Sequence, residues 1–91
     1  MLFEWSETKR TDNLTKHGVD LVFAALIFEG PVLTQIDDRN DYGEIRFISV
    51  GLIDDVAYVV VHTTRGDRTR LISAWLGGQK AYGRYKARFP G

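Results

Sequence analysis

Three strand-like segments separated by two short turns constrain the fold of this chain more than any other feature. The segments are Glu44–Leu52, Val56–Thr64 and Arg68–Trp75. Asp54-Asp55 lies between the first two, and Arg65-Gly66-Asp67 lies between the last two. Connections this short join neighbouring strands that run in opposite directions. The sequence therefore predicts consecutive hairpins in an antiparallel sheet, with the valine-rich middle segment at its centre.

The segments around this sheet predict two helices before it and one after it. Ser6 is suited to cap a helix that runs to about His17, and Gly18 then permits a left-handed turn. The second helix, Leu21–Phe28, is apolar on nearly every side and is expected to be buried. A short basic helix is expected over Gln79–Arg88. Two shorter strand-like segments complete the elements: Leu2–Trp5 and Val32–Ile36.

This order of elements predicts one α+β domain over residues 1–91. Two N-terminal helices pack on an antiparallel sheet of about four strands, and a short C-terminal helix follows. The absence of cysteine excludes a disulfide framework and a thiolate metal site. No apolar run approaches the roughly 20 residues that cross a bilayer. We therefore expect a cytoplasmic protein that is not bound to a membrane.

The charges divide the chain into an acidic and a basic part although the formal net charge is zero. Residues 1–60 contain eleven acids and five bases, whereas residues 61–91 contain seven bases and one acid. Such a polarised surface suits a polyanion at one end and another partner elsewhere. Solvated terminal charge is an equally good explanation, so the charge division alone does not identify a nucleic-acid-binding protein.

Short motifs are spread over most of residues 2–74. They are Glu4-Trp5, Asn13-Leu14, Lys16-His17-Gly18-Val19, Phe28-Glu29-Gly30-Pro31-Val32, Asp38-Arg39, Asp41-Tyr42-Gly43-Glu44, Ile45-Arg46, Ile53-Asp54, Val59-Val60-Val61, Arg65-Gly66 and Arg70-Leu71-Ile72-Ser73-Ala74. Together they resemble the BrnT family, small toxins of bacterial and archaeal toxin–antitoxin operons. The resemblance implies a RelE-like fold and an endoribonuclease that needs no metal or other cofactor and blocks translation.

The resemblance also implies two partners, an RNA substrate and a BrnA-like antitoxin that wraps part of the toxin. Operator DNA is expected to bind only indirectly, through the antitoxin. Two other functions fit the residues: a catalytically inactive module that keeps only the antitoxin and operon roles, and a non-catalytic RNA-binding domain.

Four basic residues are the candidate catalytic groups: Arg70, Arg46, His62 and His17. Metal-free RNA cleavage needs a base for the ribose 2′-hydroxyl, cations for the phosphate and an acid for the leaving oxygen. Histidine can act as acid or base, and arginine serves as a phosphate clamp. Three of them have a structural alternative: His17 at a helix end, His62 half-buried in a strand, and Arg46 paired with Glu44 or a cross-strand acid. No histidine has a carboxylate at metal-ligand spacing, so no metal site is expected.

Further basic and aromatic residues are candidates for RNA binding: Arg65, Arg68, Lys80, Tyr82 and Arg84. The chain departs from the family pattern at two positions. Trp75 stands where an arginine is expected, and His62 stands where a tyrosine is expected. A tryptophan can stack on a base but cannot neutralise a phosphate. The departure at Trp75 therefore favours the inactive alternative.

Overall fold

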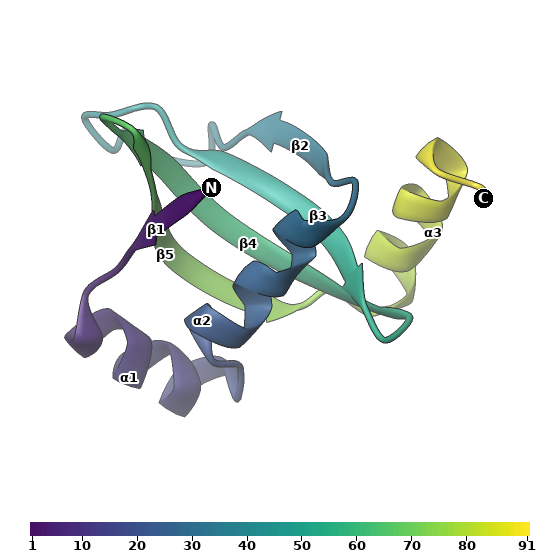
Figure 1. Ribbon diagram of the computed structural model, residues 1–91, viewed down its shortest axis with the longest axis horizontal. Helices are drawn as coiled ribbons and strands as arrows, with labels where there is room; N and C mark the ends of the chain where they lie inside the picture. Colours follow the sequence, from purple (N-terminus) through teal and green to yellow (C-terminus); the bar gives the residue numbers. More distant parts are fainter.

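The computed structural model describes all 91 residues and is built around a twisted five-stranded sheet (Figure 1). Its strand order is β1-β5-β4-β3-β2. The two hairpins expected from the sequence are confirmed, because β3 pairs with β4 and β4 with β5 in antiparallel register. The strands are β1 (Leu2–Glu4), β2 (Leu33–Ile36), β3 (Phe47–Ile53), β4 (Val56–Arg65) and β5 (Arg68–Leu76).

The expected antiparallel sheet of about four strands is wrong in two respects. The sheet has five strands, and it is mixed because β1 lies parallel to β5 at one edge, with Glu4 opposite Arg70. The chain passes from β1 through α1, α2, η1 and three further strands before β5 returns beside β1, so no short turn sets the direction of this pair. The third expected strand also starts later, at Phe47 rather than Glu44, because residues 37–46 form a loop.

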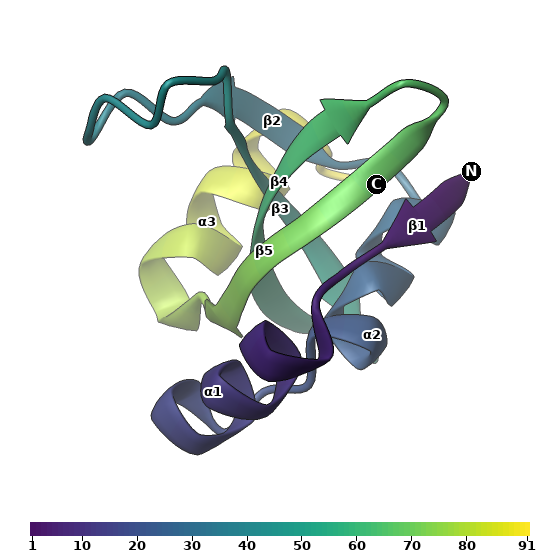
Figure 2. The ribbon, with the colours of Figure 1, turned by 90° about the vertical axis from the view of Figure 1, so that its left-hand side faces the viewer.

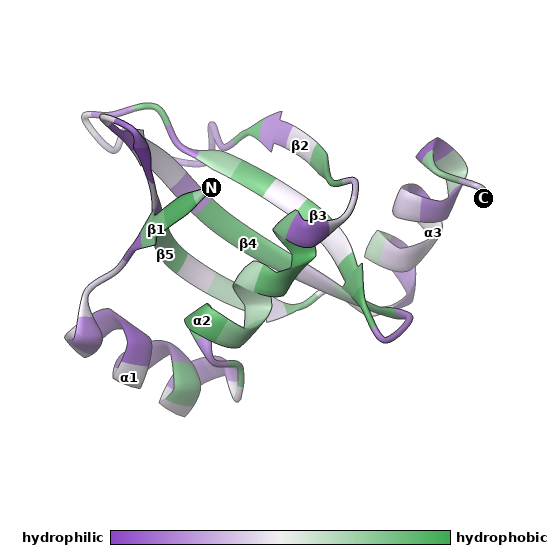
Figure 3. Ribbon diagram, in the orientation of Figure 1, coloured by the Kyte–Doolittle hydropathy of each residue, from purple (hydrophilic) through white to green (hydrophobic).

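Helices cover both faces of the sheet (Figure 2). They are α1 (Glu7–His17), α2 (Leu21–Ala24), the 3₁₀ helix η1 (Ala25–Glu29) and α3 (Gly78–Arg88). α2 and η1 pack on one face, where Leu21, Ile27 and Val60 belong to the larger core cluster. α3 packs on the other face, where Tyr85 joins Val59 in a second cluster. Because both faces of β4 are covered, its central residues form a continuous apolar run (Figure 3).

The second helix is shorter than expected, because Leu21–Phe28 divides into α2 and η1. The 3₁₀ segment brings Ile27 against Gly51 of β3, where an added Cβ would lie only 2.6 Å from the Ile27 Cβ. Glycine at position 51 therefore permits the close approach of helix and sheet. Tightening of a helix into 3₁₀ geometry near its C-terminus is common.

Helix α1 is largely exposed, as its polar sequence predicts, and it is held to the domain by Asn13. This side chain is only 6% exposed. Its Nδ2 donates to the carbonyls of Val19 and Ala74, each at 2.8 Å. Its Oδ1 accepts from the Ala74 N–H and the Ser73 hydroxyl, each at 3.1 Å. One amide thus fixes the last turn of α1 against β5, in the region where His17 lies.

Candidate functional site

An open pocket of about 650 Å³ lies beside β5, next to the C-terminal end of α1. Three segments that are distant in the sequence form its walls: the last turn of α1, the loop between β2 and β3, and the C-terminal half of β5. Its lining residues are Lys16, His17, Arg39, Ser73, Trp75 and Leu76. The pocket therefore combines an imidazole with two cations and an aromatic ring. Two of the six side chains are hydrophobic, so its surface is mostly polar.

The indole of Trp75 lies at the centre of these groups. The His17 ring is 5.8 Å from it between centroids, with the two planes tilted by 41°. The Arg39 Cζ lies 5.5 Å from the centroid of the same indole. Both distances are within the range for aromatic and cation–π contact. Trp75 thus holds together two side chains that are 22 residues apart in the sequence.

Arg39 is oriented by a buried carboxylate behind it. Asp37 is 4% exposed and receives hydrogen bonds from Arg39 Nε at 2.8 Å and Arg39 Nη2 at 2.9 Å. The Tyr42 hydroxyl donates to the same carboxylate at 3.0 Å. The Arg39 guanidinium is the main cause that lowers the pKa of Asp37 to about 2. The carboxylate therefore stays ionised and holds Arg39, whose side chain is still 53% exposed, over the pocket.

A second pocket of about 280 Å³ shares Trp75 with the first and lies between the sheet and α3. Val59 and Ile48 contribute to its apolar floor, and Lys80 and Arg84 of α3 line its side. We call the two pockets together the basic groove. Its charged and aromatic residues are Lys16, His17, Arg39, Trp75, Lys80 and Arg84. The groove has cations on both sides of the indole, which suits an extended polyanion.

Arg70 and Arg46, two of the candidate catalytic residues, form ion pairs within the protein. Arg70 Nη1 is 2.6 Å from the Glu4 carboxylate, across the β1–β5 pair. Arg46 Nε is 3.0 Å from Glu44, and its guanidinium lies 4.1 Å from the centroid of the Tyr42 ring. The structural alternative for Arg46, pairing with Glu44, is confirmed. Neither arginine lines the basic groove, and a catalytic role for either remains a prediction.

His62 lies on the opposite face of the sheet from the basic groove. Its Nε2 shares a hydrogen bond of 2.7 Å with the hydroxyl of Ser49, which is fully buried. The imidazole packs edge-on against Phe28, at 5.0 Å between centroids, and stacks on Phe47 at 5.7 Å. Burial among these side chains lowers the pKa of His62 below its ordinary value. The structure thus separates the two histidines, and His17 alone reaches the groove.

The depressed pKa of His62 predicts a loss of stability in acid. An unfolded histidine takes up a proton near pH 6.5, while the folded protein resists protonation until lower pH. The unfolded chain therefore binds more protons as pH falls below about 6.5, and the free energy of unfolding decreases. The melting temperature should fall more between about pH 7.5 and 5 in the wild type than in His62→Gln. Equal pH dependence of the two melting curves would contradict this expectation.

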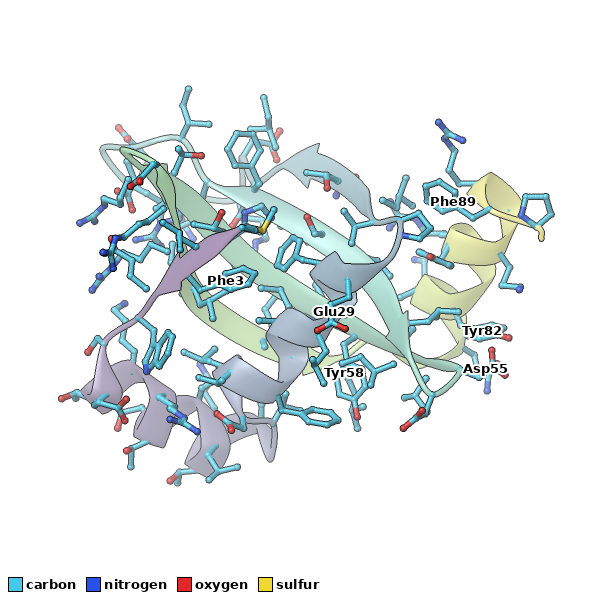
Figure 4. All side chains as sticks on the ribbon, in the orientation of Figure 1. Phe3, Glu29, Asp55, Tyr58, Tyr82 and Phe89 are labelled. Carbon is cyan, nitrogen blue, oxygen red and sulfur yellow. The ribbon has the colours of Figure 1, made fainter.

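The five candidate RNA-binding residues lie in three places. Lys80 and Arg84 line the basic groove, and Arg84 Nη2 also donates to Gln35 at 3.3 Å. Tyr82 lies outside it, because its hydroxyl donates to Asp55 in the β3–β4 turn at 2.8 Å (Figure 4). The remaining two, Arg65 and Arg68, flank the exposed β4–β5 turn, where Arg65 Nη2 is 3.3 Å from Glu44.

Sequence reasoning did not select four residues that line the first pocket: Lys16, Arg39, Ser73 and Trp75. Lys16, Arg39 and Ser73 belong to motifs that carried the family resemblance. Their presence in these motifs was the signal that could have identified them, but it did not show that the three segments lie together in the fold. Trp75 was noted as a replacement for an expected arginine that can stack on a base, but it was not selected as a site residue. Its place between His17 and Arg39 depends on the fold of the loop at residues 37–46.

Comparison with known proteins assigns the chain to a family. Residues 5–76 match the family described as the ribonuclease toxin, BrnT, of type II toxin–antitoxin systems. The matched segment includes the first pocket and ends with β5, so α3 lies outside it. No curated protein matches the chain. None of its helices has the length and apolar character needed to span a membrane. Because the match covers more than half of the sequence, the chain belongs to the BrnT family of ribonuclease toxins of type II toxin–antitoxin systems.

Proposed function

We propose that this toxin cleaves RNA in the basic groove without a metal ion. The observation that carries the proposal is the first pocket, where His17, Lys16 and Arg39 surround an exposed part of Trp75. An imidazole beside two cations is the set of groups that ribose-assisted phosphodiester cleavage requires. Both pockets are open to solvent and share Trp75, so a chain of nucleotides has access to them.

In the proposed reaction His17 takes the proton of a ribose 2′-hydroxyl as its oxygen attacks the adjacent phosphorus. The bond from phosphorus to the 5′-oxygen breaks, which leaves a 2′,3′-cyclic phosphate on one product. The departing 5′-oxygen receives a proton from Lys16 or from solvent and becomes a 5′-hydroxyl on the other. Arg39 stabilises the additional negative charge on the phosphate oxygens while the two bonds change.

The composition of the groove supports a metal-independent reaction. Its charged lining residues are cations, and the Asp37 carboxylate behind Arg39 is engaged by Arg39 and Tyr42. No group of three His, Asp or Glu side chains has the spacing to hold a metal ion. In the proposed reaction the cations of the protein stabilise the phosphate.

The family implies an antitoxin partner. We propose that this partner is BrnA-like, that it wraps part of the toxin including the exposed surface of α1, and that operator DNA binds only through it. We further propose that the fold is RelE-like, which agrees with helices that precede a mainly antiparallel sheet and a helix that follows it. The proposed place of action is the cytoplasm, where cleavage of translated RNA stops protein synthesis.

A cleavage assay in a chelator tests the proposed function. The purified protein is incubated with single-stranded RNA in EDTA, and the product ends are analysed. We expect cleavage to persist and to leave cyclic phosphate and 5′-hydroxyl ends. Loss of cleavage in EDTA that is restored by Mg²⁺ would overturn the metal-free reaction.

A second measurement separates the toxin from the non-catalytic alternatives. Expression in cells should arrest growth, and co-expression of the antitoxin from the adjacent gene should restore it. Arg88→Ala controls for the loss of a positive charge outside the groove, because Arg88 lies at the end of α3 over Phe89. It should arrest growth like the wild type. Absence of both cleavage and arrest would favour an inactive module or an RNA-binding domain.

A further inference from the structure

We infer that Trp75 is a base-stacking platform and that the basic groove therefore takes single-stranded RNA, with one unpaired base against the indole. This inference deepens the proposed function and rests on it for the identity of the ligand as RNA. It assigns a role to Trp75, which stands where the family resemblance led us to expect an arginine.

The surroundings of Trp75 differ from those of a core tryptophan. The side chain is only partly buried, and it lines both pockets of the groove. Its Nε1–H donates to no protein acceptor, whereas Trp5 Nε1 donates to Glu7 at 2.7 Å. No buried polar atom of the protein lacks a partner, so the Trp75 N–H is accessible to solvent. The indole thus lines the groove and keeps a donor that no protein group occupies.

Two flat, polarisable groups contact the indole ring of Trp75. The Arg39 guanidinium lies over it, and the His17 imidazole is tilted beside it. A nucleobase offers the same kind of face, and arginine planes stack on bases as aromatic rings do. Entry of a base requires Arg39 to move outward from the indole. The base would then lie between Trp75 and the guanidinium.

Cations flank this position on both sides, which fits the two phosphates that adjoin a stacked nucleotide. Lys16 and Arg39 line the first pocket, next to α1. Lys80 and Arg84 line the second pocket, next to α3. A base inside a duplex has both faces covered by its neighbours and cannot reach a protein ring. The groove therefore selects an unpaired strand. Stacking tolerates different bases, because every base has a π-face.

Fluorescence of Trp75 tests the inference with a ligand that cannot be cleaved. The protein carries Trp5→Phe, so Trp75 is the only tryptophan, and the ligand is a 2′-O-methyl RNA, which lacks the attacking hydroxyl. We expect the single strand to quench the fluorescence. The same sequence in a duplex should quench the fluorescence less and bind more weakly. A series of single strands, each with an abasic nucleotide at a different position, should include at least one strand that also quenches less and binds more weakly.

Variants at position 75 separate stacking from charge. Trp75→Leu should weaken single-strand binding about tenfold or more, and Trp75→Phe should retain most of it. Trp75→Arg should bind through phosphates but should no longer distinguish the intact strand from the abasic one. Melting curves of all three establish that they are folded. Equal binding by Trp75→Leu, or equal binding of duplex and single strand, would overturn the stacking role.

The outcome is independent of catalysis. Absence of cleavage together with quenching by the single strand would reject the endoribonuclease and keep the base platform. Cleavage without any effect of substitutions at position 75 on binding would support the endoribonuclease and reject the base platform.

Discussion

Replacement of His17 by alanine should lower the rate of RNA cleavage by roughly two to four orders of magnitude, the usual contribution of a positioned general base. His17 is the histidine that lines the basic groove, beside Trp75 and with Arg39 and Lys16 nearby. In the proposed reaction its loss removes the group that accepts the 2′-hydroxyl proton and leaves Lys16 and Arg39 in place to bind the phosphate. RNA binding should therefore change little while the single-turnover cleavage rate falls.

Lys9→Ala is the matched control for this variant. Lys9 is an exposed residue of the same helix and does not line the groove. It should cleave RNA at the wild-type rate, which would show that a change in α1 alone is not responsible for the loss. A cleavage rate of His17→Ala equal to that of the control would show that the catalytic base lies elsewhere.

Asn13→Ala should destabilise the protein by about 3 kcal/mol, because buried backbone groups lose their partners. The carbonyl of Val19 and the N–H and carbonyl of Ala74 all bond to this one side chain. Alanine leaves these groups without the amide and opens a small void between α1 and β5. For a domain of this size the melting temperature should fall by roughly 10 to 20 °C.

Asn40→Ala provides the comparison within the same chain. The Asn40 amide is exposed, and its one side-chain contact is a long hydrogen bond of 3.5 Å to the Tyr42 hydroxyl. Its removal should cost no more than about 0.5 kcal/mol. Thermal unfolding of the two variants measures the difference directly. Similar melting temperatures would show that α1 is held to the sheet by other contacts.

The parts of the fold that could be predicted from the sequence are those set by neighbouring residues. The β3–β4 turn is marked by Asp54 and Asp55, which adopt φ values of 50° and 62°, and the β4–β5 turn by Gly66 at 62°. The cap at Ser6 and the left-handed Gly18 follow from equally local rules. The pairing of β1 with β5 could not be predicted in this way. It joins three residues to a strand more than sixty positions away, and no turn between them fixes its direction.

The same distinction holds for the candidate site. Lys80 and Arg84 were selected as basic residues of the last helix and do line the groove. Arg70 was selected from a motif, but its ion pair with Glu4 depends on the parallel edge strand. Arg39 reaches Trp75 only because the loop at residues 37–46 folds around buried Asp37. Charge and sequence motifs therefore identify the cationic residues. The fold of the loop at residues 37–46 determines which of them lie close together.

The bonds between Asn13 and Ala74 also bear on the order in which the parts of the toxin come together during synthesis. α1 is synthesised well before its partner strand, because Asn13 and Ala74 are 61 residues apart in the sequence. Contacts this far apart in sequence form late, because the intervening chain must first be closed into a loop. A nascent chain therefore carries His17 without Trp75 beside it. The proposed groove is therefore incomplete until β5 has been synthesised and has joined α1.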